Sequence, residues 1–129
     1  MTPLTILIVD DSVDLLDLYS AALSKAGYRP TTATSAEAAV RTLTIDLLPC
    51  AVVTDLTLGG VEGWRLIRRL KGDPLTRSIP IVVLTGCCDP SVAILGREAG
   101  CAAVLIKPCL PDELAAVLRR VLPADSAVA

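Results

Sequence analysis

Five polar residues that suit phosphate and magnesium chemistry each stand at the end of a short apolar run. They are Asp10, Asp11, Asp55, Thr85 and Lys107. Carboxylates are the hard oxygen ligands that Mg²⁺ prefers, and one or two of them suffice beside water and phosphate oxygens. A carboxylate can also attack phosphorus to form an acyl phosphate, while an ammonium group offsets the charge of the transferring group. The residue types therefore indicate a site for Mg²⁺ and phosphoryl transfer.

The apolar runs that precede these residues are too short for helices and are typical of buried parallel strands. They cover residues 4–9, 51–54, 81–84 and 103–106, and each is rich in Val, Ile or Leu. The carboxyl ends of parallel strands meet at one edge of an open α/β sheet. We therefore expect the five polar residues to form one site, although they lie far apart in the chain.

Segments with helical periodicity lie between the strands, which gives the order βαβαβαβαβα. The predicted helices cover residues 13–26, 35–45, 61–71, 91–99 and 111–122. Ser12 is the expected N-cap of the first helix, and Gly27 is its expected stop. A second, polar strand is predicted over residues 31–33. Because Pro30 precedes it and lacks an N–H donor, we expect this strand at an edge of the sheet.

The length of 129 residues fits one domain that buries a substantial core. We expect this domain over residues 1–122, followed by a flexible tail over residues 123–129.

The net charge of −2 predicts no direct binding to nucleic acid. No apolar stretch is long enough to cross a bilayer, and acidic residues follow the N-terminus too soon for a signal peptide. We therefore expect a cytoplasmic protein that has no membrane partner.

The cysteines are interpreted as small buried hydrophobic residues of a protein in a reducing compartment. Their number is odd, no C-x-x-C spacing occurs and the chain has no His, so a zinc site is not expected. They are Cys50, Cys87, Cys88, Cys101 and Cys109. The adjacent pair Cys87 and Cys88 leaves a redox sensor as the alternative interpretation.

Four basic residues, Arg65, Arg68, Arg69 and Lys71, cluster on the predicted third helix. The first interpretation is a solvated helix face, and the alternative is a partner site.

A separate expectation concerns the bond between Lys107 and Pro108. We predict a cis peptide there, because the chain must turn sharply to aim the lysine at the site.

The sequence resembles the receiver domain of two-component response regulators, a family that includes single-domain chemotaxis regulators. The matching motifs are ILIVDDS at 6–12, VVTDLTLGGVEGWRLI at 52–67, IVVLTG at 81–86 and GCAAVLIKP at 100–108. The resemblance covers nearly the whole chain. It implies a doubly wound, flavodoxin-like α/β fold, whose five-stranded parallel sheet has the strand order 2-1-3-4-5.

The resemblance also implies a role for each site residue. Asp55 is the phosphoacceptor, Thr85 the switch hydroxyl and Lys107 the lysine that binds the phosphoryl group. The implied Mg²⁺ ligands are Asp10, Asp11, Asp55 and the backbone carbonyl of Thr57. The phosphoryl donor is a phosphohistidine on a sensor histidine kinase or phosphotransfer protein, and the downstream protein partner is not identified. The chain is then a phosphoacceptor signalling domain that has only self-phosphorylation and dephosphorylation chemistry, not an enzyme.

Several positions depart from the family pattern. Gly59 and Glu62 replace the usual Pro and Asp of the loop after the phosphoacceptor. Val104 replaces the usual aromatic residue of the fifth strand, and Cys109 replaces the Phe after Lys-Pro. Val104 is too small and stiff for the swing of an aromatic side chain. We therefore predict that phosphorylation shifts mainly the loop over residues 85–90 and the start of the fourth helix.

Two other functions are compatible with parts of this pattern. A pseudo-receiver would keep the fold as a protein-docking module without being phosphorylated, and the loss of the aromatic at Val104 is the feature that favours it. A phosphatase of the haloacid dehalogenase type also uses a strand-end Asp and Mg²⁺. That enzyme needs a second Asp two residues later, where this chain has Thr57, and a cap insertion, for which the chain has no segment.

Overall fold

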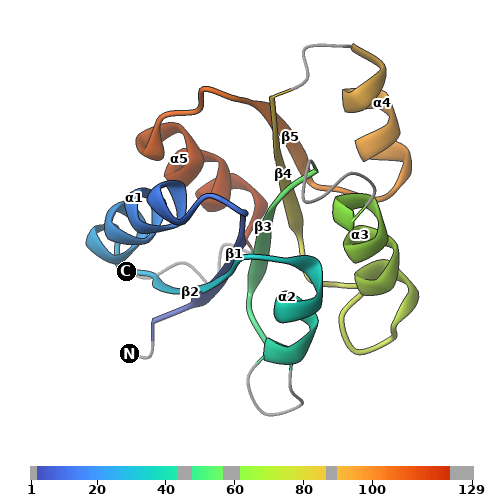
Figure 1. Cartoon of the computed structure of the whole chain (residues 1–129), viewed down its shortest axis with the longest axis horizontal. Coiled ribbons are helices and arrows are strands. Elements are labelled where there is room, and N and C mark those ends of the chain that lie inside the picture. The colour runs from blue at the N-terminus through green and yellow to red at the C-terminus, as the bar shows by residue number, and fades with distance from the viewer. Residues whose placement is uncertain (1–2, 44–47, 57–61, 87–89, 123–129) are drawn as a thin grey trace.

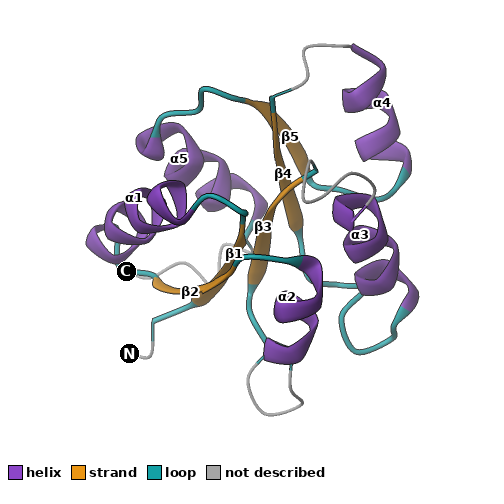
Figure 2. Ribbon diagram, in the orientation of Figure 1, coloured by secondary structure: helices purple, strands orange, loops and turns teal. Residues whose placement is uncertain are grey.

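The computed structural model describes residues 3–43, 48–56, 62–86 and 90–122. Within these residues, parallel strands alternate with helices from β1 to α5 (Figure 2). The strands are β1 (Thr5–Val9), β2 (Arg29–Ala33), β3 (Ala51–Asp55), β4 (Ile81–Thr85) and β5 (Ala103–Ile106). The helices are α1 (Val13–Lys25), α2 (Ala36–Thr42), α3 (Glu62–Gly72), α4 (Pro90–Glu98) and α5 (Pro111–Val121). The sheet order is β2-β1-β3-β4-β5, which confirms the predicted fold class and topology.

The sheet is covered on both faces, because α1 and α5 lie on one side while α2, α3 and α4 lie on the other (Figure 1). Successive strand residues face opposite layers. In β1, Ile6 and Ile8 pack against α1 and α5, whereas Leu7 and Val9 belong to the core under α2 and α3. The central strands are therefore apolar at almost every position, which is the pattern that made them recognisable in the sequence.

The predicted edge position of β2 is correct, but the strand is longer than expected. It pairs only with β1, and its register places Pro30 opposite Ile6 and Ala33 opposite Val9. The sequence prediction began at residue 31 because Arg29 and Pro30 do not resemble strand residues. An edge strand needs hydrogen-bond donors on one side only, so a proline is tolerated within it.

The helix ends follow the capping signals in the sequence. Ser12 caps α1 by accepting a hydrogen bond from the N–H of Leu15 at 3.3 Å. Gly27 has a φ of 99°, the left-handed conformation that favours glycine directly after a helix. α1 ends one residue before its predicted end, and α4 begins one residue before its predicted start. The predicted end of the second helix at residue 45 is wrong, because α2 ends at Thr42 and Leu43, its C-cap, has left the helical conformation.

The described cysteines are free thiols in apolar surroundings. Cys101 and Cys109 are buried, and Cys50 is half-buried. Burial raises the pKa of the Cys101 and Cys109 thiols above its ordinary value, so both are protonated at neutral pH. These three residues match the interpretation as small hydrophobic side chains. The redox alternative concerned Cys87 and Cys88, which lie outside the described residues.

Candidate phosphoryl and metal site

A lysine links two buried carboxylates at the carboxyl edge of the sheet. Val9 of β1 pairs with Thr54 of β3, so the residues that follow them, Asp10 and Asp55, lie side by side. Asp55 is only 3% exposed, and Asp10 is buried to the same degree. The Nζ atom of Lys107 lies 2.9 Å from Oδ2 of Asp10 and 2.9 Å from Oδ2 of Asp55. The prediction that these three residues meet in space is confirmed.

Backbone hydrogen bonds hold these side chains in place. The N–H of Lys107 donates to the carbonyl of Thr85 at 2.7 Å, which fixes the end of β5 against the end of β4. The N–H of Ser12 donates to Oδ1 of Asp10 at 2.9 Å, so the N-terminal turn of α1 orients this carboxylate. The peptide bond between Lys107 and Pro108 is cis, as predicted.

Thr85, the predicted switch hydroxyl, is buried at the same edge of the sheet. Asp55 pairs with Leu84 of β4, so Thr85 stands one residue beyond the level of Asp55 on the neighbouring strand. It also pairs with Ile106, the residue before Lys107. The register therefore places Thr85 beside both Asp55 and Lys107.

A third carboxylate completes a possible metal site. Asp10, Asp11 and Asp55 each offer an oxygen atom, and these oxygens lie within 4.8 Å of one another. Asp11 is exposed, while the other two are buried. An all-oxygen donor set that is open on one side suits a hard cation that retains water, which is the coordination typical of Mg²⁺. The further predicted ligand, the carbonyl of Thr57, lies outside the described residues.

The charge of Lys107 is stabilised by its two partners. Burial alone lowers the pKa of this amine, but hydrogen bonds and charge attraction from Asp55 and Asp10 outweigh burial, so its pKa is raised above 10.5. A raised lysine pKa contributes stability that is complete below the ordinary pKa and is lost as the pH rises through the folded-state pKa. At neutral pH this contribution is therefore fully present.

Known proteins are similar to this chain over most of its length. The family model of the response regulator receiver domain matches residues 6–119. The chain belongs to the response regulator receiver domain family. It is 40% identical over 126 residues to the phosphate regulon transcriptional regulatory protein PhoB of Pseudomonas aeruginosa, covering 95% of this chain and 55% of that protein. The chain thus spans about half the length of this curated relative.

Solved structures agree with the fold of this receiver domain. A putative response regulator from Chloroflexus aurantiacus has a TM-score of 0.85 and 37% identity, and the match covers 93% of this chain and 98% of that one. The chemotaxis response regulator CheY4 of Vibrio cholerae has a TM-score of 0.85 and 26% identity, covering 94% of this chain and 100% of that one. Receiver domains are signalling domains and not classical enzymes. Across the described part of the chain, no helix combines the length and apolar character needed to cross a membrane.

Smaller side chains, Val104 and Cys109, stand at the two positions where the family pattern has an aromatic residue. Val104 is half-buried in β5 and faces Gly96 of α4, where an added Cβ would lie 2.6 Å from Cγ2 of Val104. Cys109 is buried against α1 and α5. Of the two altered loop positions, Gly59 lies outside the described residues, and Glu62 is the first residue of α3.

Two supporting residues escaped the sequence analysis. Gly63 lies directly against the backbone of Asp55 and Leu56, although in the sequence it resembled only a helix residue after a loop. The hydroxyl of Tyr19 donates a buried hydrogen bond to the carbonyl of Cys109 at 2.9 Å. Tyr19 lies on the buried side of α1, and helical periodicity carries no information about a partner 90 residues away.

We expect Tyr19→Phe to lower the free energy of unfolding by about 1 to 2 kcal/mol, because the buried carbonyl of Cys109 loses its donor. Urea denaturation followed by circular dichroism measures this change. Tyr28→Phe is the matched control, since Tyr28 is half-buried and no hydrogen bond of its hydroxyl is found in the described part of the chain. Equal effects of the two substitutions would contradict the role of the Tyr19 hydrogen bond.

We expect Lys107→Met to destabilise the metal-free domain by about 2 kcal/mol, because Asp10 and Asp55 then lack a counter-charge. The effect is smaller than for a fully buried pair, since the lysine side chain is 22% exposed. Mg²⁺ should restore part of the loss, since a bound cation replaces the missing positive charge. Thermal melts with and without Mg²⁺ test this. A loss of stability that Mg²⁺ leaves unchanged would mean that the cation does not enter the carboxylate cluster.

Proposed function

We propose that this receiver domain accepts a phosphoryl group on Asp55 and works as the switch of a two-component system. The observation that carries the proposal is the set of three carboxylates whose oxygens lie within 4.8 Å of one another, with Lys107 bonded to two of them. A strand-end carboxylate beside an ammonium group and a cation site is suited to in-line attack on phosphorus.

Each site residue has a part in the proposed reaction. An oxygen of Asp55 forms the new bond to phosphorus, and the donor's nitrogen leaves. Asp10, Asp11, Asp55 and the backbone carbonyl of Thr57 would hold Mg²⁺, which would offset negative charge on the phosphoryl oxygens. Lys107 then turns from Asp55 toward the phosphoryl group, and the Thr85 hydroxyl donates to another of its oxygens. In the proposed dephosphorylation, water attacks the phosphorus, the carboxylate of Asp55 leaves and inorganic phosphate is released. The proposed chemistry is therefore self-phosphorylation and dephosphorylation.

The proposed donor is a phosphohistidine on a sensor histidine kinase or phosphotransfer protein. An open groove of about 510 Å³ borders the site, and Lys107 is one of its lining residues. Its apolar lining includes Leu15, Leu18 and Leu110. A donor protein that packs on this groove brings its phosphohistidine beside Lys107 and Asp55. The downstream protein is not identified. We propose that residues 1–122 form the phosphorylated domain and that the reaction takes place in the cytoplasm.

Incubation with acetyl phosphate and Mg²⁺, followed by mass spectrometry, tests the proposed function. A receiver domain gives a phosphate on Asp55 that persists long enough to be mapped, and the label disappears when Mg²⁺ is chelated beforehand. Rapid turnover that releases inorganic phosphate without a detectable aspartyl phosphate favours the phosphatase alternative. No label at any concentration favours the docking module. The assembled carboxylates and lysine support the first outcome over the third.

We expect the switch to act through the fourth helix and not through a rotating side chain on β5. Cγ2 of Val104 occupies the space that a Cβ at residue 96 would fill, and a β-branched side chain is stiff about χ1. Beryllium fluoride with Mg²⁺ mimics the phosphoryl group, and methyl NMR reports the response. We predict large shifts at Thr85 and in the first turn of α4, with Val104 in its original rotamer. A new rotamer at Val104 with an unchanged Thr85 would contradict this switch.

A further inference from the structure

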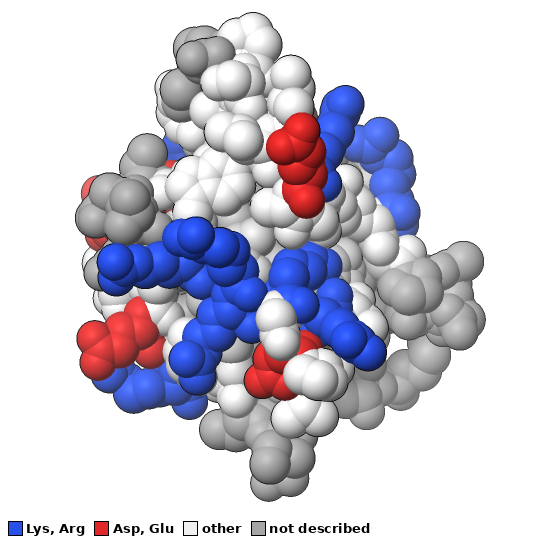
Figure 3. Space-filling model, turned by 90° about the vertical axis from the view of Figure 1, so that its right-hand side faces the viewer, with Lys and Arg blue, Asp and Glu red and all other residues white. Residues whose placement is uncertain are grey.

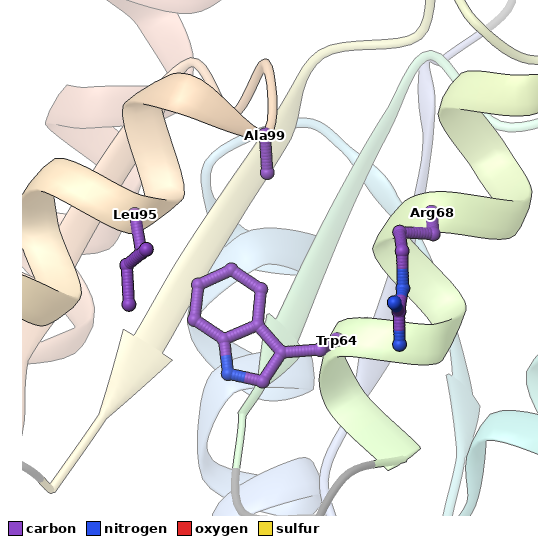
Figure 4. A pocket seen from close by; sticks show the side chains of 4 residues that line it. All are labelled: Trp64, Arg68, Leu95 and Ala99. Carbon is purple, nitrogen blue, oxygen red and sulfur yellow. The ribbon is translucent and has the colours of Figure 1, made fainter.

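A second hollow lies between α3 and α4, on the face of the sheet that α2, α3 and α4 cover. Its volume is about 360 Å³, and it is lined by Trp64, Arg68, Leu95 and Ala99. Figure 4 shows the Trp64 ring reaching from α3 toward Leu95 of α4 and Ala99 just after it, with Arg68 one turn further along α3. We call this hollow the α3–α4 groove. Apart from the guanidinium of Arg68, its lining is apolar, and Leu95 is 50% exposed.

Three arginines lie on the exposed side of α3. Arg68 lines the groove, whereas Arg69 lines a hollow on the α2 side of this helix. Arg65, Arg68 and Arg69 are exposed on α3, and in the described part of the chain none of them forms an ion pair. Figure 3 shows Lys and Arg side chains gathered on this face, beside an uncharged region. The whole chain carries a net charge of −2, so this positive region is local. We call the three residues the arginine belt.

The fourth basic residue of the sequence cluster has a different role. The Nζ atom of Lys71 donates to the carbonyls of Arg77 at 3.0 Å and Ile79 at 3.4 Å. This lysine therefore holds the loop after α3 in place. The exposed acids on this side, Asp73 and Glu98, form no ion pair with the arginine belt. The belt is therefore available for carboxylates from another molecule.

The α3–α4 groove is pre-formed by the packing of its two walls. Gly96, the residue after Leu95 on α4, lies so close to Val104 that an added Cβ would be 2.6 Å from Cγ2 of the valine. On the α3 wall, Leu66, Ile67 and Leu70 are fully buried against the sheet. A groove with fixed walls binds a partner without first ordering itself, which favours affinity.

We propose that the α3–α4 groove and the arginine belt bind an acidic amphipathic helix of a partner protein. Apolar anchors at helical spacing fill the groove, and Asp or Glu residues on the flanking positions meet the arginines. Guanidinium groups bind carboxylates through two parallel hydrogen bonds, which gives such a surface both charge and geometric selectivity. A bilayer is disfavoured because the apolar residues line a hollow and do not project. Nucleic acid is disfavoured because it would use the belt and leave the apolar groove empty.

The proposal is tested by selecting peptides that bind the whole protein from a random library. The peptides are about 15 residues long, a length at which helices begin to be stable. We expect the enriched peptides to be acidic, with apolar residues at positions i, i+3 or i+4, and i+7. Trp64 is the only tryptophan, so its fluorescence reports directly on occupancy of the groove. Binding should weaken as salt is added, because exposed charge pairs are screened.

Arg68→Glu and Leu95→Ser should each weaken binding of a selected peptide by roughly tenfold or more. Arg120→Glu is the matched control, since Arg120 is an exposed arginine in the last turn of α5. All variants should still be labelled by acetyl phosphate, which separates this surface from the proposed function. Basic or featureless peptides, no enrichment, or equal binding by wild type and Arg68→Glu would overturn the proposal. Stronger binding of a DNA duplex or of anionic vesicles, lost in Arg68→Glu, would overturn it as well.

Discussion

Replacing Asp55 by Asn should abolish phosphorylation by acetyl phosphate, because a neutral amide cannot attack phosphorus. The fold should survive. The amide keeps the shape of the carboxylate, and the lysine still bonds to Asp10 at 2.9 Å. Removing one of two buried carboxylates also relieves their mutual repulsion, so we expect a melting temperature equal to or above that of wild type.

The measurement is intact mass after incubation with acetyl phosphate and Mg²⁺, with calorimetry on the same samples. Asp112→Asn is the matched control, because Asp112 lies exposed in the first turn of α5 and should leave labelling unchanged. If the Asp55 variant is still labelled to the same extent, the phosphoacceptor is another residue.

Gly63→Ala should produce the largest loss of stability among single-methyl additions. A Cβ at this position would lie 2.6 Å from Cα and 2.6 Å from the carbonyl oxygen of Leu56, and 2.7 Å from the carbonyl oxygen of Asp55. All three atoms belong to the backbone, so no side chain can rotate away. Overpacking typically costs 1 to 3 kcal/mol, and we expect about 3 kcal/mol or more here. Because the displaced backbone carries Asp55, labelling should also slow.

Gly72→Ala is the control for the same chemical change. A Cβ at Gly72 meets no atom within 4 Å, and alanine has the higher helix propensity at this last residue of α3. We expect it to be neutral or to stabilise by up to about 1 kcal/mol. Urea denaturation of both variants makes the comparison. Similar effects for the two glycines would show that the close contact of α3 with the Asp55 strand relaxes without cost.

The fold and most of the site followed from the sequence because their signals are local. Apolar runs that end in a polar residue identify parallel strands, and the shared edge of such strands brings Asp10, Asp55 and Lys107 together without any knowledge of loops. The convergence of the lysine on both carboxylates is what the structure adds. The boundaries of β2 were wrong because an edge strand accepts Arg29 and Pro30, residues that a central strand excludes.

The features that escaped prediction depend on contacts between distant segments. Nothing near Gly63 in the sequence indicates that its missing side chain admits the backbone of Asp55. The pairing of Gly96 with Val104 is of the same kind: a loss of bulk on one strand matched by a loss of bulk on the facing helix. The basic cluster was visible in the sequence. Its separation into a structural Lys71 and an arginine belt that forms no ion pair with the described residues was not.

The proline in β2 has a consequence for how the protein behaves at high concentration. The N–H of Arg29 donates to the carbonyl of Leu4 and the carbonyl of Ala33 accepts from Asp10, so these alternate residues point toward the neighbouring strand. Pro30 and Thr32 then point outward, and Pro30 has no N–H to offer there. The β2 margin of the sheet thus presents a single strand amide, at Thr32, to another chain. Because edge-to-edge growth of β-aggregates needs a continuous row of donors, this margin should resist such assembly during storage and crystallisation.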